Sequence, residues 1–249
     1  MERDIEIRTE DGSMTTFVVH PDDGHAHPVV LFLMDAPGKR PLLHAMARTI
    51  AERGYYVMLP NLYYRFTPAF ELDFSSRESY ARMSELMHGI GARMVERDAA
   101  AMLDAAATDP AADAMVVGCV GYCMSGPFAI CLGAALGARV RAAASFYGAR
   151  LITDTKGSPH LRLGDISGEL YVACAEHDEW VPLDMVDRFE ATMQASGVRG
   201  RLERYWGTDH GFAFSDRPAH DATAEARHWT ALFDLFERNL HNTTAPAGG

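Results

Sequence analysis

Residues 114–138 read AMVVGCVGYCMSGPFAICLGAALGA and carry no charged side chain. A stretch of this length is long enough to cross a bilayer, but five glycines and Pro127 interrupt it. The valines at 116, 117 and 120 favour a strand, whereas the glycines at 121 and 126 favour a turn. We therefore expect a buried strand at 115–120, a sharp turn, and a buried helix at 125–137.

The sequence on both sides of this stretch alternates between strand and helix patterns. The unbroken apolar run at 29–34 is typical of a strand that is buried on both faces, as in parallel sheets. Further strands are expected at 55–59, 142–147, 170–174 and 201–205, and helices at about 42–51, 93–108, 184–196 and 221–240. At the N-terminus, two alternating segments flank a turn at 10–13 and predict a β-hairpin. The fold class is therefore α/β, with a mostly parallel central sheet and helices on both faces.

Composition limits the class of partner. The chain has 249 residues and a net charge of −11, which argues against nucleic acid or an anionic membrane as a partner. We expect one domain over residues 1–249. The four cysteines lack the spacing of a zinc site or a disulfide framework, and the charged N-terminus lacks an apolar signal segment. These features predict a reduced, cytoplasmic protein.

The turn at 121–126 reads GYCMSG, which has the spacing of a nucleophile elbow with Cys123 as the nucleophile. A tight turn between a strand and a helix lifts one side chain above the sheet, and the helix N-terminus favours a thiolate and an oxyanion. Ser125 does not fit this motif, because the residues two positions before and after it are Cys123 and Pro127, and neither is a glycine. The alternative is that Cys123 is a buried, inert cysteine, which is the commoner role of cysteine.

An acid and a histidine follow in the chain order that such an elbow requires. Glu176, Asp178 and Glu179 all lie at the end of an expected strand, and Asp178 fits best because an aromatic residue and Val-Pro follow it. His210 lies in a turn-rich loop before the last helix. The alternatives are a helix cap or turn residue for Asp178 and a loop histidine with satisfied hydrogen bonds for His210.

Together these patterns resemble the dienelactone hydrolase family of α/β-hydrolases over about residues 28–240. The resemblance rests on six stretches: LMDAPG at 33–38, LPNLYYR at 59–65, GYCMSG at 121–126, FYG at 146–148, EHDEWVP at 176–182 and HGF at 210–212. It implies an α/β-hydrolase fold and a catalytic triad of Cys123, Asp178 and His210. It also implies an oxyanion hole formed by the backbone N–H groups of Met124 and Ala36.

The chain departs from the family at the expected substrate site. Asp35 stands where the family's dienelactone-specific enzymes carry a glutamate, and Phe214 stands where they carry a carboxylate-binding arginine. The carboxylate anchor is therefore expected to be absent or relocated. The candidates for a relocated anchor are Arg65, Arg82 and Arg93, of which Arg93 is expected to be a surface residue. The expected pocket walls are Tyr122, Trp180 and Phe212.

The segment 61–92 is expected to be irregular. Its aromatic and methionine residues could line an acyl pocket or form core beneath a long excursion, and the length of the segment favours a cap over the site.

The resulting hypothesis is hydrolysis of a small-molecule ester or lactone through a thioester on Cys123, without a cofactor and by a monomer or homodimer. Two alternatives remain: acyl transfer by the same triad, and a non-catalytic thiol-redox sensor. The histidines and acids between His20 and His27 resemble a metal cluster, but we expect solvated turn chemistry there and no metal.

Overall fold

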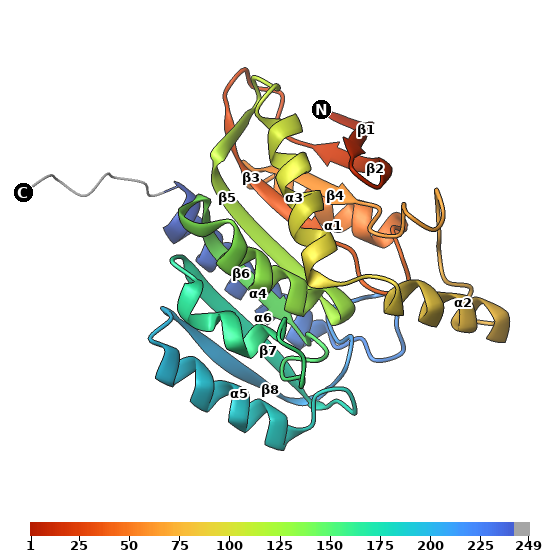
Figure 1. The fold of residues 1–249 in the computed structure, drawn as a ribbon, viewed down its shortest axis with the longest axis vertical. Coiled ribbons are helices and arrows are strands. Elements are labelled where there is room, and N and C mark those ends of the chain that lie inside the picture. The colour runs from red at the N-terminus through yellow and green to blue at the C-terminus, as the bar shows by residue number, and fades with distance from the viewer. Residues whose placement is uncertain (242–249) are drawn as a thin grey trace, which may run out of the picture.

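One eight-stranded sheet organises residues 1–241, the part of the chain that this structure, a computed structural model, describes (Figure 1). The strands lie in the order β1-β2-β4-β3-β5-β6-β7-β8. The first two form the expected antiparallel hairpin, and β2 also runs antiparallel to β4, whereas all neighbours from β4 to β8 are parallel. The strands are β1 (Glu2–Thr9), β2 (Gly12–Val19), β3 (His27–Leu33), β4 (Tyr56–Pro60), β5 (Ala112–Tyr122), β6 (Val140–Phe146), β7 (Glu169–His177) and β8 (Gly200–Asp209).

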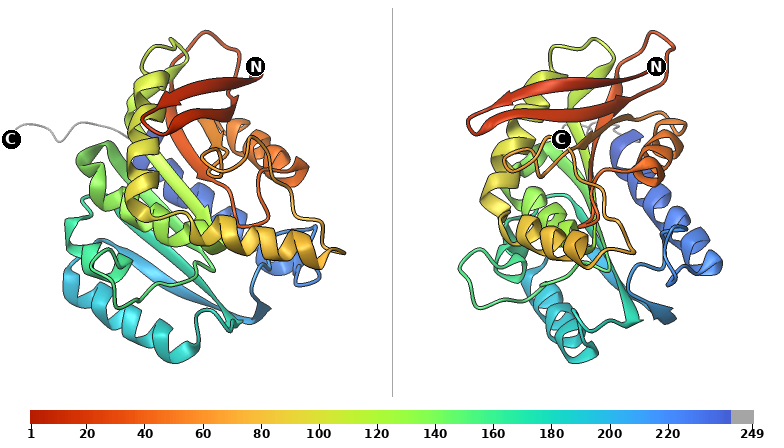
Figure 2. Two further views of the ribbon diagram at one scale, coloured as in Figure 1. Left: turned by 45° about the vertical axis from the view of Figure 1, so that its right-hand side comes forward. Right: turned by 90° about the vertical axis from the view of Figure 1, so that its right-hand side faces the viewer.

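Helices cover both faces of the sheet, as the sequence predicts. Helices α1 (Pro41–Ala51) and α6 (Ala222–Phe236) lie on one face, and the other carries α3 (Ala92–Ala106), α4 (Gly126–Ala135) and α5 (Leu183–Ser196) (Figure 2). Helix α4 is buried along nearly its whole length, which explains why its sequence is apolar all round.

The expectation of an irregular segment at 61–92 is wrong for its second half, which forms helix α2 (Arg77–His88). The Ser76 side chain caps this helix by accepting a hydrogen bond from the backbone N–H of Ser79. Leu86 is its one buried residue. Helix α2 projects from the body of the molecule (Figure 2). Two smaller differences are a 3-10 segment at Pro159–Asp165 and a π-turn at Glu237–His241 that follows α6.

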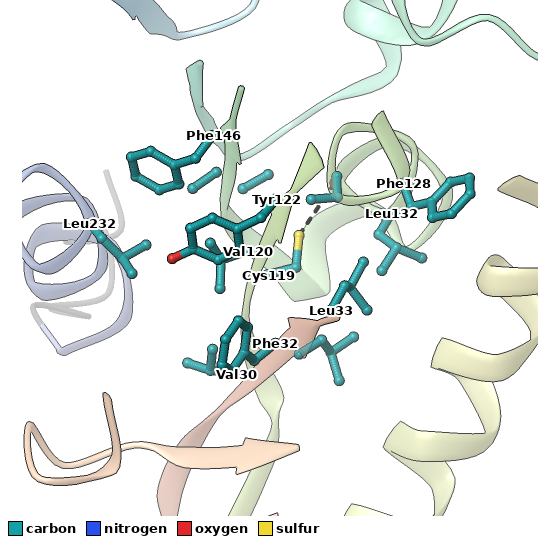
Figure 3. Packing of buried hydrophobic residues seen from close by; sticks show 14 of the residues in the cluster. Val30, Phe32, Leu33, Cys119, Val120, Tyr122, Phe128, Leu132, Phe146 and Leu232 are labelled. Carbon is teal, nitrogen blue, oxygen red and sulfur yellow. Dashed lines mark hydrogen bonds between the residues drawn. The ribbon is translucent and has the colours of Figure 1, made fainter. Parts of the chain in front are cut away.

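Alternation along β5 sends neighbouring side chains to opposite faces of the sheet. The Cys119 thiol donates to the carbonyl oxygen of Ala129 on α4 at 3.3 Å (Figure 3). The Tyr122 hydroxyl lies on the other face, 2.6 Å from Nε2 of His228 on α6. Because β3, β5, β7 and β8 run parallel, their carboxyl ends meet at one edge of the sheet, and that edge brings together the segments that follow these four strands.

Candidate active site

Cys123 occupies a strained turn between β5 and α4. Its φ of +53° lies in the left-handed region that non-glycine residues rarely adopt. The turn needs glycine on both sides, because a Cβ at Gly121 would overlap the Ser125 carbonyl and a Cβ at Gly126 would overlap Gly148. The Ala149 N–H donates to the Cys123 carbonyl at 2.9 Å and fixes the turn from the end of β6. The partly exposed Cys123 side chain is thereby held above the sheet edge.

The Ser125 hydroxyl, by contrast, is fully buried and used within the turn. It accepts from the Tyr122 N–H at 3.0 Å and lies 3.1 Å from the carbonyl oxygens of Leu33 and Tyr122, which accept its proton. Of the two side chains, only that of Cys123 is partly exposed.

Asp178 and His210 meet across the ends of β7 and β8. The His210 Nδ1 donates to Asp178 Oδ2 at 2.7 Å, and the other Asp178 oxygen accepts from the Trp180 N–H at 2.9 Å. The His210 N–H in turn donates to the His177 carbonyl at 3.2 Å. Asp178 is therefore oriented from both sides, and it fixes the histidine tautomer with the proton on Nδ1.

The two competing acids have other surroundings. Glu176 accepts a hydrogen bond from the Gly207 N–H at 2.6 Å, and Glu179 is exposed. Of the three acids weighed from the sequence, Asp178 is thus the one that contacts His210.

His210 is partly buried, its Nε2 atom is buried without a hydrogen-bond partner, and the residue borders the same cavities as Cys123. Burial lowers the pKa of His210, but the hydrogen bond that His210 donates to Asp178 and the adjacent Cys123 outweigh that effect and raise the pKa to about 10. The neighbourhood therefore favours a proton on His210 when the cysteine is a thiolate.

The expected oxyanion donors lie beside Cys123. Ala36 and Met124 both border a cavity of about 380 Å³ that also contains Cys123 and His210. The Tyr63 hydroxyl donates to the Ala36 carbonyl at 2.8 Å and lies 3.5 Å from the Met124 sulfur, so one side chain contacts both residues. This contact of Tyr63 has no signal in the sequence.

A cluster of charges centred on the buried Asp35 and Arg40 backs the site. Arg40 donates to both oxygens of Asp35 at 2.5 and 3.3 Å and to Asp216 at 2.6 Å. Arg217 donates to Asp35 at 3.0 Å, while its Nε lies 3.8 Å from Asp216 Oδ1 and has no hydrogen-bond partner. Arg217 borders both cavities beside Cys123. The sequence did not predict this position, because only the folded loop after His210 brings Arg217 there.

Two cavities border Cys123. The first, called the apolar cavity, is the one of about 380 Å³ described above. The second, called the polar cavity, has about 230 Å³, and three unpaired polar atoms belong to its walls: Tyr147 Oη, His210 Nε2 and Arg217 Nε. The apolar cavity is lined by Ala36, Pro37, Leu72, Tyr80, Met83, Ser84, Met87, Cys123, Met124, Ala149, Arg150, Trp180, His210 and Arg217. The polar cavity is lined by Asp35, Cys123, Tyr147, His210, Gly211, Phe214, Arg217, Pro218 and Ala219.

The expected aromatic walls are only partly found at these cavities. Trp180 borders the apolar cavity, and Phe214 and Asp35 border the polar cavity. Tyr122 and Phe212 are instead fully buried and border neither. Tyr122 packs towards α6, and Phe212 stacks on Tyr205 with ring centroids 4.7 Å apart.

The arginines suggested as carboxylate anchors lie elsewhere. Arg65 forms a bidentate pair with the buried Asp98 at 2.8 Å and also binds Asp11. Arg82 and Arg93 pair with glutamates three residues further along their own helices. None of the three lines either cavity beside Cys123, and Arg93 is 82% exposed, as expected for a surface residue.

Within residues 1–241, no group of three or more histidine, cysteine, aspartate or glutamate side chains is placed to hold a metal ion. In the segment between His20 and His27, His27 instead pairs with Asp23 at 2.9 Å and lies 3.2 Å from the Gly54 carbonyl. Across the same described residues, no helix has the length and apolar character that crossing a membrane requires.

Comparisons with known proteins show the family to which the chain belongs. The dienelactone hydrolase family profile matches residues 14–240. A Synechocystis protein provisionally named a carboxymethylenebutenolidase is 27% identical, with 95% of this chain and 96% of that protein covered. A Rhodococcus opacus carboxymethylenebutenolidase is 25% identical, with 88% and 84% covered. A Klebsiella pneumoniae structure provisionally titled a dienelactone hydrolase superposes with a TM-score of 0.86 at 19% identity, with 96% and 98% covered. The chain thus belongs to the dienelactone hydrolase family and is a carboxylic ester hydrolase that acts on small molecules.

Proposed function

We propose that this hydrolase cleaves an ester or lactone through a thioester on Cys123, with Asp178 and His210 completing a triad. The observation that carries the proposal is the shared cavity: Cys123 on its strained turn borders the same space as the unpaired Nε2 of a histidine whose Nδ1 is bound to Asp178. A nucleophile, a base and an orienting acid in this arrangement perform acyl transfer.

The reaction proceeds in two halves. His210 takes the thiol proton, the Cys123 thiolate attacks the carbonyl carbon, and the N–H groups of Met124 and Ala36 hold the oxyanion. The carbon–oxygen bond to the leaving group breaks, and the leaving oxygen takes the proton from His210. A water molecule then gives a proton to His210 and attacks the thioester, which releases the acid and the Cys123 thiolate. His210 returns its proton to the Cys123 sulfur and completes the cycle. Asp178 stabilises the charged imidazole in each half.

The sensor alternative gains no support from the other cysteines. Cys119 is the nearest cysteine in the chain, and its buried thiol is bonded to Ala129 on α4. Burial raises the pKa of the Cys119 thiol and raises those of Cys131 and Cys174 to about 11 and about 12. These thiols are poor resolving groups, because the thiolate is the reactive form.

The test is capture of the acyl group. Wild-type protein quenched in acid during turnover of p-nitrophenyl acetate should gain one acetyl mass on the peptide that contains Cys123, and Cys123→Ala should gain none and release no p-nitrophenol above background. Full turnover by the folded Cys123→Ala protein would contradict the proposal.

The matched control concerns the acid. Asp178→Asn should lower kcat by about 10⁴-fold, the size of the effect when a triad histidine loses its carboxylate. Glu179→Gln changes an exposed neighbour and should retain activity. If Glu179→Gln were the damaging change, the acid would be misassigned.

A further inference from the structure

A third cavity lies against the apolar cavity. This distal cavity has a volume of about 210 Å³ and shares four wall residues with the apolar cavity: Met87, Met124, Ala149 and Arg150. Its other apolar walls come from the start of α3, from α4 and from the turn before β7. They are Ile90, Ala92, Pro127, Phe128, Cys131 and Pro159.

The shared wall places the distal cavity next to the nucleophile. Met124 directly follows Cys123 and borders both cavities, and Met87 borders both from helix α2. Methionine side chains are flexible and adapt to apolar groups of different shape. A chain that starts at Cys123 and fills the apolar cavity is therefore led past two adaptable side chains into the distal cavity.

The distal cavity opens to solvent, because Gly91, Arg150, Thr155 and Gly157 in its wall are exposed. A substrate chain can therefore reach it without rearrangement of the core. Ligand sites are the main class of well-formed apolar cavities with a few polar groups at their margin. The distal cavity has that character, with hydroxyl side chains at Thr153, Thr155 and Ser158 beside its apolar walls.

The two cavities beside Cys123 suit different parts of the substrate. The leaving oxygen and the incoming water exchange protons with His210 Nε2, and the polar cavity offers Tyr147 Oη and Arg217 Nε for further hydrogen bonds. The acyl group stays on Cys123 between the two halves of the reaction. The apolar cavity is the remaining space beside Cys123 that can hold it.

We propose that the apolar and distal cavities form one channel for a linear, apolar acyl chain of medium length, with the far end of the chain in the distal cavity. The proposal rests on the proposed function, because the thioester at Cys123 places the chain. The substrate class is an ester of a medium-chain fatty acid, and the distal cavity determines the preferred chain length.

Arg150 is the charged member of the shared wall. Its Nη2 donates to His88 Nε2 at 3.0 Å, and His88 Nδ1 donates to the Ser84 carbonyl at 2.6 Å, so the neutral histidine satisfies both contacts. The guanidinium thereby joins the channel wall to helix α2. An acyl chain with a terminal carboxylate tests whether this charge or the apolar wall selects the substrate.

The first experiment measures kcat/KM of the wild type for p-nitrophenyl esters from acetate to dodecanoate. Each methylene that enters the channel should raise kcat/KM by about two- to fourfold until the distal cavity is full, because burying a methylene contributes up to about 0.8 kcal/mol. A maximum at acetate would overturn the proposal. A higher kcat/KM for an acyl chain with a terminal carboxylate would also overturn it. So would an equal rise in kcat/KM when the alcohol of an acetate ester, rather than the acyl chain, is lengthened.

The second experiment fills the distal cavity. Ala92→Phe places a ring at the first residue of α3. Ala92 is partly buried, and it borders the distal cavity but not the apolar cavity. The ratio of kcat/KM for octanoate to that for acetate should fall at least tenfold, and Ala92→Leu should lie between the two. The control Arg93→Phe adds the same ring at a position that is 82% exposed and should keep the wild-type ratio.

The outcomes separate this proposal from the one on which it rests. If acetate and octanoate are both inert and no acyl group appears on Cys123, the proposed function fails. If acetate is turned over but folded Ala92→Phe and Ala92→Leu keep the wild-type ratio, the channel alone is wrong.

Discussion

His210 is the residue whose surroundings most change its chemistry. Its Nδ1 is bound to Asp178 and its ring borders the cavities that contain Cys123, and these two groups raise the pKa of His210 from 6.5 to about 10 against the opposing effect of burial. An NMR titration of the His210 ring should therefore give a pKa above 6.5 in the wild type and a lower value in Asp178→Asn and in Cys123→Ala. An equal pKa of His210 in all three proteins would mean that neither Asp178 nor Cys123 shifts it.

The same shift links stability to pH. A raised folded-state pKa contributes stability that is fully present below about pH 6.5 and is lost as the pH rises through about 10. The difference in the urea midpoint between wild type and Asp178→Asn should thus be larger at pH 6 than at pH 10. Asp184→Asn removes a carboxylate that is 76% exposed and serves as the control, with a difference that stays constant over this range. A constant difference for Asp178→Asn as well would contradict the linkage.

At the scale of elements, the turn between β5 and α4 depends on glycine. A Cβ at Gly121 would overlap the Ser125 carbonyl, which is rigid backbone, so Gly121→Ala should destabilise the protein by about 1–3 kcal/mol, the usual cost of overpacking. Gly164→Ala is the matched control, because a Cβ there meets nothing within 4 Å. Denaturant unfolding of both variants measures the contrast, and equal stability would show that the turn can relax.

Tyr63 connects two elements of the proposed oxyanion hole. Because its hydroxyl contacts the Ala36 carbonyl and the Met124 sulfur, Tyr63→Phe should lower kcat about tenfold with a smaller change in KM, as expected when a transition-state donor is less well positioned. Tyr64→Phe removes the neighbouring hydroxyl, which binds Thr9 and Asp98 instead, and should leave kcat unchanged. A loss confined to KM in Tyr63→Phe would assign that residue to substrate binding.

The elements also show what sequence can and cannot predict. The turn at Cys123 could be predicted because its signal is local: the glycine spacing and the change from a strand to a helix pattern lie within a few residues. Helix α2 was missed because its apolar side chains do not form a buried stripe. Tyr80, Met83 and Met87 line the apolar cavity, and only Leu86 is buried. Arg217 was missed because its place beside Cys123 depends on the folded loop after His210, which has no local signature.

At the scale of the whole molecule, charge predicts a preference for neutral substrates. The chain carries a net charge of −11, and the cluster beside the nucleophile has two cations, Arg40 and Arg217, against two anions, Asp35 and Asp216. A substrate carboxylate next to the reacting carbonyl therefore meets no net positive charge from this cluster. Phe214 presents an apolar ring to the same cavity.

The measurement compares p-nitrophenyl esters of succinate with a free and a methylated second carboxyl group. The methylated ester should have the higher kcat/KM, by roughly 1–3 kcal/mol, the usual cost of an unpaired polar group. Arg217→Gln should widen this difference in kcat/KM, because it removes one of the two cations that neutralise Asp35. Arg82→Gln changes an exposed ion pair on α2 and should leave the difference unchanged. A wild-type preference for the free acid would show that Arg217 is available to the substrate.

The cluster that joins Asp35 and Arg40 to Asp216 and Arg217 also has a consequence for protein synthesis. Its two halves are separated by most of the chain, and Cys123 lies between them. At about 5–20 residues per second, a ribosome needs roughly 4 to 17 seconds to extend the chain from Cys123 to His210. During that interval the nascent chain carries Cys123 but neither His210 nor the second half of the cluster, so the proposed hydrolysis can begin only after residues 210–217 have been synthesised.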